Sequence, residues 1–428
     1  MTESTKTEPQ AISIVQRGNL KALEKTLRKQ WRLGQNIVLC WSADERGLLV
    51  LFVPHYFLGN YCAVDDALEQ DGLGNEAFIR ELVSGQRRKT REQLFSVASR
   101  LDVSPTFIKL NTALTDEASL LQEVEQIIKR YGISYVDSRA VLLFDISGFS
   151  LRTPFEQASQ LNSLSYSMNS AYNKLLAQGI EINFARTTTG DGYYVWNRDL
   201  GPDADQDLFC FMLLVVADNA VAQAASRGNT TPTIRTAYHI GSHYELYQAE
   251  GVNPTLFSYI VGDVTIELAR MVDLIQPHQL LVGDFSCEVR DNDSNTSGMA
   301  TAPQFVQACQ REMVSLTGIK LSNKMISLFR CYLTEGASGS GETMPRRFKV
   351  TDKHGLSRHA YNLQLEIELE GDVLQLGLDA SHLPGRSSPE SELPLAQADR
   401  TPDLSTEERI YDLSSLLKKR PKNVMTED

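Results

Sequence analysis

The chain has 428 residues, of which 42% are hydrophobic, and its formal net charge is −12. This length is enough for two or three domains with ordinary cores. The negative charge argues against binding to nucleic acid or to an anionic membrane, because both attract a basic protein surface. We therefore expect a mostly globular protein with no nucleic-acid partner and no membrane partner.

The cysteines and the N-terminus give further limits on the class of protein. Six cysteines are scattered along the chain without a CxxC pair, so neither a disulfide framework nor a thiolate zinc site is predicted. The first ten residues, MTESTKTEPQ, lack the apolar segment of a signal peptide, and the longest apolar run, LFCFMLLVVA, is too short to span a bilayer. These features favour a cytoplasmic protein.

The N-terminal part of the chain predicts a small domain. Residues 1–15 are polar and are expected to be disordered. The helical pattern GNLKALEKTLRKQW follows, and then the two strand-like runs NIVLCW and GLLVLFVP. Helices that alternate with short buried strands indicate a small α/β domain over residues 16–132. It contains no catalytic cluster, so a regulatory, scaffolding or purely structural role is open.

A second domain is predicted over residues 136–288. It begins with the apolar run SRAVLLFDISGFS and continues with a helix whose start, Thr153-Pro154-Phe155-Glu156, has the residues of a capping box. The later patterns follow in the order hairpin, helix, strand, strand, helix, strand. This order predicts an α+β fold with helices packed against one face of a mixed or antiparallel sheet.

The remaining chain divides into two parts. Residues 289–380 include RRFKVTDKHG and YNLQLEIELEGDVLQLGLD, whose alternating pattern predicts antiparallel strands that complete or extend a sheet. Residues 381–428 are rich in proline, serine and acidic residues and are expected to be disordered, with one possible short helix at EERIYDLSSLLKK.

Two aspartates stand out because each follows a strand pattern and is placed where it can be exposed. Asp145 lies in LLFDISGF, and Asp191 lies at the predicted hairpin tip in FARTTTGDGYYVW. If the two segments are neighbours, their carboxylates converge and form a site for a hard divalent cation. The small-residue turn after Asp145 would present backbone amides to phosphate oxygens.

Four strings in this order resemble the class III nucleotidyl cyclases, the adenylate and guanylate cyclase family. They are F-D-I-x-G-F at 144–149, G-D-G at 190–192, R-x-x-x-H-x-G at 235–241 and V-G-D-x-x-x-x-x-A-R at 261–270. The resemblance covers roughly residues 138–288. It implies a ferredoxin-like catalytic domain that converts a nucleoside triphosphate to a 3′,5′-cyclic nucleotide and pyrophosphate for intracellular second-messenger signalling.

The resemblance also implies roles for individual residues. Asp145 and Asp191 match the aspartates that hold two Mg²⁺ or Mn²⁺ ions, with the carbonyl of Ile146 as a further ligand. Arg270 matches the arginine that steadies charge on the reacting phosphorus. The backbone amides of the phosphate-binding turn match Ile146, Ser147, Gly148 and Phe149. In this family the sites lie at the interface of a head-to-tail homodimer, so a second copy of the chain is the implied partner.

The chain departs from the family pattern at the positions that read the base and orient the ribose. Ile266 stands in place of the ribose-orienting asparagine, and Ala185 in place of the purine-reading lysine, with Arg186 adjacent to it. Tyr259 falls on the second base-reading position. We expect Arg186 and Tyr259 to contact the nucleotide. The base is left open: a purine, or a pyrimidine as in the bacterial anti-phage cyclases that lack the usual readers.

Three hypotheses follow from these observations. The first is a nucleotide cyclase with an N-terminal regulatory or scaffolding domain. The second is a catalytically degenerate nucleotide-binding module, which Ile266 favours because an isoleucine side chain cannot hydrogen-bond to the ribose. The third is a structural interaction protein, in which Asp145 and Asp191 only cap turns and can be replaced without loss of function.

Overall fold

The computed structural model describes residues 12–63, 74–249, 256–273, 275–291, 296–337, 343–351, 357–378 and 390–392. The disorder expected over residues 1–15 and 381–428, and the short helix expected at EERIYDLSSLLKK, lie outside these ranges except for residues 12–15 and 390–392. Residues 12–15 lead into the first helix, whose N-cap is Ser13: the Ser13 hydroxyl accepts a hydrogen bond from the amide of Gln16.

The N-terminal domain is built on a three-stranded antiparallel sheet of order β1-β2-β3. Its strands are β1 (Asn36–Asp44), β2 (Gly47–Pro54) and β3 (Thr106–Lys109), and a short 3-10 helix, η1 (Arg32–Gly34), precedes β1. Its helices are α1 (Ile14–Trp31), α2 (Phe57–Cys62), α3 (Asn75–Ser84), α4 (Arg91–Arg100) and α5 (Ala118–Lys129). The expected small α/β domain is thus present.

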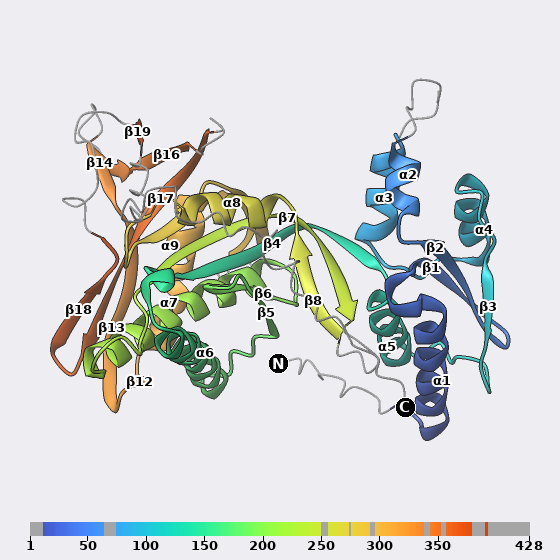
Figure 1. Ribbon diagram of the computed structural model, residues 1–428, viewed down its shortest axis with the longest axis horizontal. Coiled ribbons are helices and arrows are strands. Elements are labelled where there is room, and N and C mark those ends of the chain that lie inside the picture. Colours follow the sequence, from blue (N-terminus) through green and yellow to red (C-terminus); the bar gives the residue numbers. More distant parts are fainter. Residues whose placement is uncertain are drawn as a thin grey trace, which may run out of the picture.

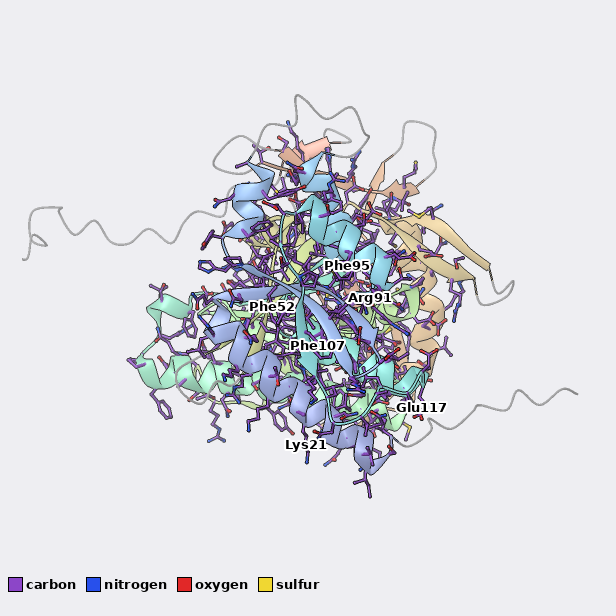
Figure 2. All side chains as sticks on the ribbon, turned by 90° about the vertical axis from the view of Figure 1, so that its right-hand side faces the viewer. Lys21, Phe52, Arg91, Phe95, Phe107 and Glu117 are labelled. Atoms are coloured by element: carbon purple, nitrogen blue, oxygen red, sulfur yellow. The ribbon has the colours of Figure 1, made fainter. Side chains whose placement is uncertain are left out.

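Helices cover both faces of this small sheet. Leu23, Leu27 and Trp31 of α1 pack with α5 on one face, and α3 and α4 pack on the other through residues such as Ile79 and Leu94. Figure 2 views the molecule from this domain and labels Phe95 and Phe107, which are exposed. The apolar faces of these helices are thus buried inside the domain.

Among the described residues, twelve strands form a second, larger sheet. Its main path is β12-β13-β17-β9-β7-β4-β6-β5, with β8 on β7, β16 and β18 on β17, and β19 on β16. Only the β7–β9 and β16–β19 pairs are parallel. The central strands are β4 (Ile133–Ile146), β5 (Phe184–Thr188), β6 (Gly192–Asn197), β7 (Ile234–Ala249), β8 (Leu256–Val261) and β9 (Leu280–Gly283).

The C-terminal strands belong to this same sheet because β17 pairs with β9. They are β12 (Lys320–Leu321), β13 (Lys324–Leu333), β16 (Arg347–Thr351), β17 (Ser357–Leu369), β18 (Asp372–Leu376) and β19 (Glu390–Glu392). Two separate hairpins are formed by β10 (Ser286–Asp291) with β11 (Thr296–Thr301), and by β14 (Glu335–Ala337) with β15 (Thr343–Pro345). The central sheet is thus extended by β12, β13, β16, β17, β18 and β19, whereas β11, β14 and β15 lie outside it.

Helices cover both faces of the large sheet. The larger core lies against α6 (Pro154–Ala177), α7 (Pro202–Ala225) and α9 (Ala302–Glu312), which the 3-10 helix η3 (Met313–Leu316) follows. The opposite face is covered by α8 (Asp263–Val272). The expected α+β architecture is confirmed, but the expectation that all helices lie on one face of the sheet is wrong. The apolar side of α8, with Val264 and Leu268, buries the second face of the sheet.

Helix α7 explains the apolar run noted in the sequence. Among the described residues it alone has the length and composition that could cross a membrane, and 61% of its apolar stretch is buried inside the protein. Residues Leu208–Ala217 are almost fully enclosed by the sheet, α6 and α9. The composition of α7 therefore matches its place in the core.

The same core gathers four of the scattered cysteines. Cys210, Cys287, Cys309 and Cys331 all lie in it as free thiols. Burial raises the pKa of Cys210 and of Cys287 to about 12. Such thiols behave as small apolar side chains rather than as nucleophiles.

The long strands β4 and β7 connect the two sheets. Figure 1 shows β4 running from the N-terminal domain into the larger sheet. Tyr135 of β4 and Tyr244 of β7 pack against the core of the N-terminal domain with ring centroids 5.1 Å apart. At the other end of β4 lies Asp145, so one continuous strand joins the N-terminal domain to the predicted site.

Candidate functional site

Asp145 lies near the end of β4 between the neighbouring strands β6 and β7. The strand register places Gly192 opposite Asp145 on β6 and Arg235 opposite it on β7. The Asp145 carboxylate accepts a hydrogen bond from Arg235 Nε at 2.8 Å and a second from Arg235 Nη2. Arg235 thus fixes the orientation of this carboxylate.

Asp191 lies in the tight turn between β5 and β6, as the sequence predicts. The Thr189 amide donates to the Gly192 carbonyl at 3.0 Å, and Gly190 takes a φ of +106°, a conformation that favours glycine. The Ile146 amide donates to the Asp191 carbonyl at 2.9 Å. This bond ties the turn to the end of β4 and brings the two aspartates to one place.

The charges around Asp145 explain its protonation behaviour. The pKa of Asp145 is raised to about 6: burial is the largest cause, Arg235 opposes the rise, and Asp191 and Asp273 contribute to it. The three carboxylates therefore lie close enough to repel one another. A cation placed between them would relieve this repulsion.

The donor set suits Mg²⁺ or Mn²⁺. No group of three His, Cys, Asp or Glu side chains that could hold a metal ion occurs among the described residues. Magnesium, however, is usually held by one or two carboxylates, with the remaining positions filled by water and substrate phosphates. Asp145 and Asp191, with the Ile146 carbonyl near them, fit this pattern.

The turn after β4 offers fewer amides than the four expected. The Ile146 amide is bonded to Asp191 and the Ser147 amide donates to the Thr233 carbonyl at 2.8 Å. The amides of Gly148 and Phe149 have no acceptor among the described residues. Gly148 has a φ of +66° and leads into the 3-10 helix η2 (Phe149–Leu151). An incoming anion would therefore meet Gly148 and Phe149 rather than the whole turn.

Helix α8 carries the predicted catalytic arginine on its outer side. Val264, Leu268 and Met271 face the sheet, whereas Ile266 is 45% exposed and Arg270 follows it one turn later. Residues four apart lie on the same side of a helix. Ile266 and Arg270 therefore share one side of α8, opposite to the residues that pack on the sheet.

The two sequence positions considered for base reading on β5 lie on opposite faces of the sheet. Ala185 is buried next to Trp196 on the face of the sheet that α8 covers. On β4, Leu142 and Phe144 point into the core on the opposite face. Asp145, the next residue after Phe144, therefore points to the α8 face. Arg186 therefore points to the opposite face, where its guanidinium lies 5.2 Å from the Tyr193 ring centroid. The structure does not bring Arg186 to the aspartates, because successive strand residues alternate between faces.

Tyr259 lies within electrostatic reach of the site through Tyr194. It is 42% exposed on β8, and it interacts electrostatically with Tyr194 of β6, which in turn interacts with Asp145 and Asp273. A series of polar side chains thus leads from Asp145 and Asp273 past Tyr194 to Tyr259.

Sequence reasoning missed three residues of this site. The sequence patterns assign no site role to Arg235, Asp273 or Tyr194. Arg235 does lie in one of the four family-like strings, and Tyr194 lies three residues after Asp191, so both could have been examined. Asp273 follows α8 directly, and only the tertiary fold brings it near Asp145.

Other polar residues of the second domain lie outside this site. Arg139 of β4 bonds to His243 Nε2 at 3.2 Å and to Glu245 Oε2 at 3.0 Å in a buried cluster. Burial lowers the pKa of His243 to about 4, so its ring is neutral at physiological pH. Glu267 of α8 forms an ion pair with Arg358 at 2.7 Å. The Arg139 cluster is structural.

Comparisons with known proteins give the following findings. No protein-family model matches the chain, and no curated protein matches it. The guanylate cyclase domain of RhGC from Catenaria anguillulae in complex with GTP is 12% identical, with a TM-score of 0.30, over 54% of this chain and 97% of that chain.

Two further solved structures give similar values. The guanylyl cyclase Cya2 is 13% identical, with a TM-score of 0.29, over 53% of this chain and 91% of that chain. The adenylyl cyclase CyaB from P. aeruginosa is 11% identical, with a TM-score of 0.29, over 54% of this chain and 95% of that chain. These structural neighbours are guanylyl and adenylyl cyclases, and the function proposed for this chain rests on the residues of its own site.

Proposed function

We propose that this protein is a cytoplasmic nucleotide cyclase, which converts a nucleoside triphosphate to a 3′,5′-cyclic nucleotide and pyrophosphate in second-messenger signalling. The observation that carries the proposal is the junction of β4 with the Asp191 turn. The hydrogen bond from the Ile146 amide to the Asp191 carbonyl places two carboxylates beside the amides of Gly148 and Phe149. A carboxylate pair next to free amides is suited to a metal–triphosphate complex.

Two Mg²⁺ or Mn²⁺ ions would be held by Asp145, Asp191 and the Ile146 carbonyl. When bound, such ions balance the charge on the phosphates and favour ionisation of an attacking hydroxyl. The raised pKa of Asp145 supports the assignment, because a carboxylate destabilised by burial and by two like charges gains most from a cation.

The chain's own groups would position the substrate. The amides of Gly148 and Phe149 would hold phosphate oxygens, and Arg235 keeps the Asp145 carboxylate in one orientation. Cyclisation needs the 3′-oxygen of the ribose in line with the α-phosphorus and a cation near the developing charge. Arg270 is the residue proposed to supply that cation.

The position of Arg270 supports a head-to-tail homodimer. Ile266 of α8 is exposed, Arg270 lies one turn after it and is half-buried, and Tyr259 and Val261 of the neighbouring strand β8 are exposed. Exposed apolar side chains around an arginine suit contact with another protein surface. In the proposed dimer this surface of one copy faces the aspartates of the other, so that both sites are completed across the interface.

The base is proposed to be read from the side of Tyr259. Ala185 is buried beside Trp196, with 4% of its surface exposed, and Arg186 lies on the far face of the sheet. Neither residue replaces the purine-reading lysine of the cyclases that the sequence resembles. Selection between a purine and a pyrimidine would then depend on Tyr259 and on groups from the second copy.

One observation favours a second candidate function, a nucleotide-binding module without turnover. Ile266 presents an apolar side chain where the family-like pattern has a hydrogen-bonding asparagine, and this side chain is well exposed. Binding through the aspartates and the turn would survive this change. Orientation of the ribose would have to come from another group.

Incubation of the purified protein with each of the four ribonucleoside triphosphates and Mn²⁺ tests both functions. The cyclase predicts a cyclic product from at least one nucleotide, reduced on the order of 100-fold or more in Asp191→Ala because charge compensation by the metal is lost. Asp199→Ala is the matched control, since Asp199 is exposed at the far end of the same hairpin. Metal-dependent binding without product for all four nucleotides would instead establish the module.

A further inference from the structure

Tyr194 connects the strand that follows the Asp191 turn to helix α8. It lies on β6 on the α8 face of the sheet, and its hydroxyl donates a hydrogen bond of 2.9 Å to the backbone carbonyl of Thr265. Thr265 is buried in the first half of α8. The residue that follows it, Ile266, belongs to the outer surface.

The other polar contacts that hold α8 are more exposed. At its start, the Ser242 hydroxyl donates to Asp263 Oδ2 at 3.1 Å in an exposed position. Further along, Glu267 pairs with Arg358, whose side chain is 47% exposed. The apolar contacts beneath α8 are not directional. The Tyr194 bond is a sheltered and directional contact, and it ties α8 to strand β6.

The surroundings of the Tyr194 hydroxyl place it between the two halves of the site. Burial raises the pKa of Tyr194 to about 12, with further contributions from Tyr259, Asp273 and Asp145. The hydroxyl is therefore protonated at physiological pH and acts as a donor. It lies within electrostatic reach of Asp145 and Asp273 while it bonds to the helix that carries Arg270.

We propose that Tyr194 is a positioning residue that sets the place of Ile266 and Arg270 on α8 for the site of a second copy of the chain. This inference rests on the proposed function. In a head-to-tail dimer, the aspartates of one copy would face α8 of the other. Loss of the Tyr194 hydroxyl would then impair the partner's site and not the metal site of its own chain.

Tyr194→Phe removes the hydroxyl and retains the buried ring. We expect kcat to fall about fivefold, the effect of one lost hydrogen bond, with KM for the metal–nucleotide complex changed less than kcat. Tyr193→Phe is the matched control, because Tyr193 is the next residue on β6 and faces the opposite side of the sheet. An equal effect of both substitutions on kcat would overturn the inference.

Mixed dimers identify the copy on which Tyr194 acts. The Tyr194→Phe protein is mixed with Asp191→Ala protein, whose own metal pair is broken but whose α8 is intact. In the mixed dimer, one site combines intact aspartates with an intact α8. We therefore expect the mixture to turn over faster than Tyr194→Phe protein alone at the same total chain concentration. Turnover below that of Tyr194→Phe alone would mean that Tyr194 acts within its own chain, and would overturn the inference.

A second mixture separates this inference from the proposed function. Arg270→Ala and Asp191→Ala proteins should complement each other in the same way if α8 serves the partner's site. Recovery in this pair but not in the Tyr194→Phe mixture overturns the role of Tyr194 alone. Absence of recovery in the Arg270→Ala pair, or of product from the unmodified protein, overturns the proposed dimeric cyclase and this inference with it.

Discussion

Arg87 is the best place to test how the N-terminal domain is joined to the larger sheet. Its side chain is fully buried, and Nη1 donates to the carbonyls of Val38 at 2.7 Å and Leu39 at 3.1 Å. Nη2 donates to the Ile133 carbonyl and to the Ser134 hydroxyl at 3.1 Å. One guanidinium thus bonds strand β1 to the start of β4, the strand that ends beside Asp145.

Replacement of Arg87 by methionine keeps an unbranched side chain and removes the four hydrogen bonds. Each buried acceptor left unpaired costs about 1–2 kcal/mol. Against this, burial lowers the pKa of Arg87 to about 10, so removal of the buried cation recovers about 3 kcal/mol. The net loss in the free energy of unfolding of the N-terminal domain is therefore about 3 kcal/mol, within the range for breaking a buried charged contact.

Urea unfolding followed by tryptophan fluorescence measures this loss. Trp31 and Trp41 lie in the N-terminal domain and report on it directly. Arg88→Met is the matched control, because Arg88 is 40% exposed and its partner Asp116 is largely exposed, so its effect should be below about 0.5 kcal/mol. Equal unfolding midpoints for Arg87→Met and the unmodified protein would refute the role of Arg87 as the joint.

Two further predictions concern the domain built on the larger sheet. Asp205 accepts a hydrogen bond from the Ala140 amide, and burial raises the pKa of its carboxyl to about 6. Because this pKa is higher in the folded than in the unfolded chain, ionisation of Asp205 lowers the free energy of unfolding as the pH rises. Asp205→Asn should therefore stabilise the protein by about 1 kcal/mol more at pH 8 than at pH 5, and equal effects on thermal unfolding at the two pH values would contradict this. Gly190→Ala and Gly201→Ala both introduce a side chain at a φ near +106° with open space around it. Each should lower the free energy of unfolding by about 1–2 kcal/mol. Only Gly190→Ala should weaken Mn²⁺–nucleotide binding in calorimetry, and equal weakening by both would show that the turn does not set the site.

Local sequence determined much of the fold because its signals act over a few residues. The capping box at Thr153 and Glu156 is confirmed: the Glu156 amide donates to the Thr153 hydroxyl at 3.3 Å and the Thr153 amide donates to Glu156 Oε2 at 2.9 Å. The tight turn at Gly190 is confirmed in the same way. Caps and turns depend on the residues that form them, so they can be read without a tertiary structure.

The sequence by itself thus determined the α+β architecture, the strand that ends at Asp145 and the turn that presents Asp191. Only the tertiary structure decided what surrounds these two aspartates. Strand register placed Arg235 against Asp145, directed Arg186 to the far face, and brought Tyr194 beneath α8. Register depends on contacts between residues far apart in the chain, and a shift by one residue would reverse every side chain on a strand. For this reason the sequence alone suggests the reaction, whereas the residues that surround the two aspartates could be identified only from the tertiary structure.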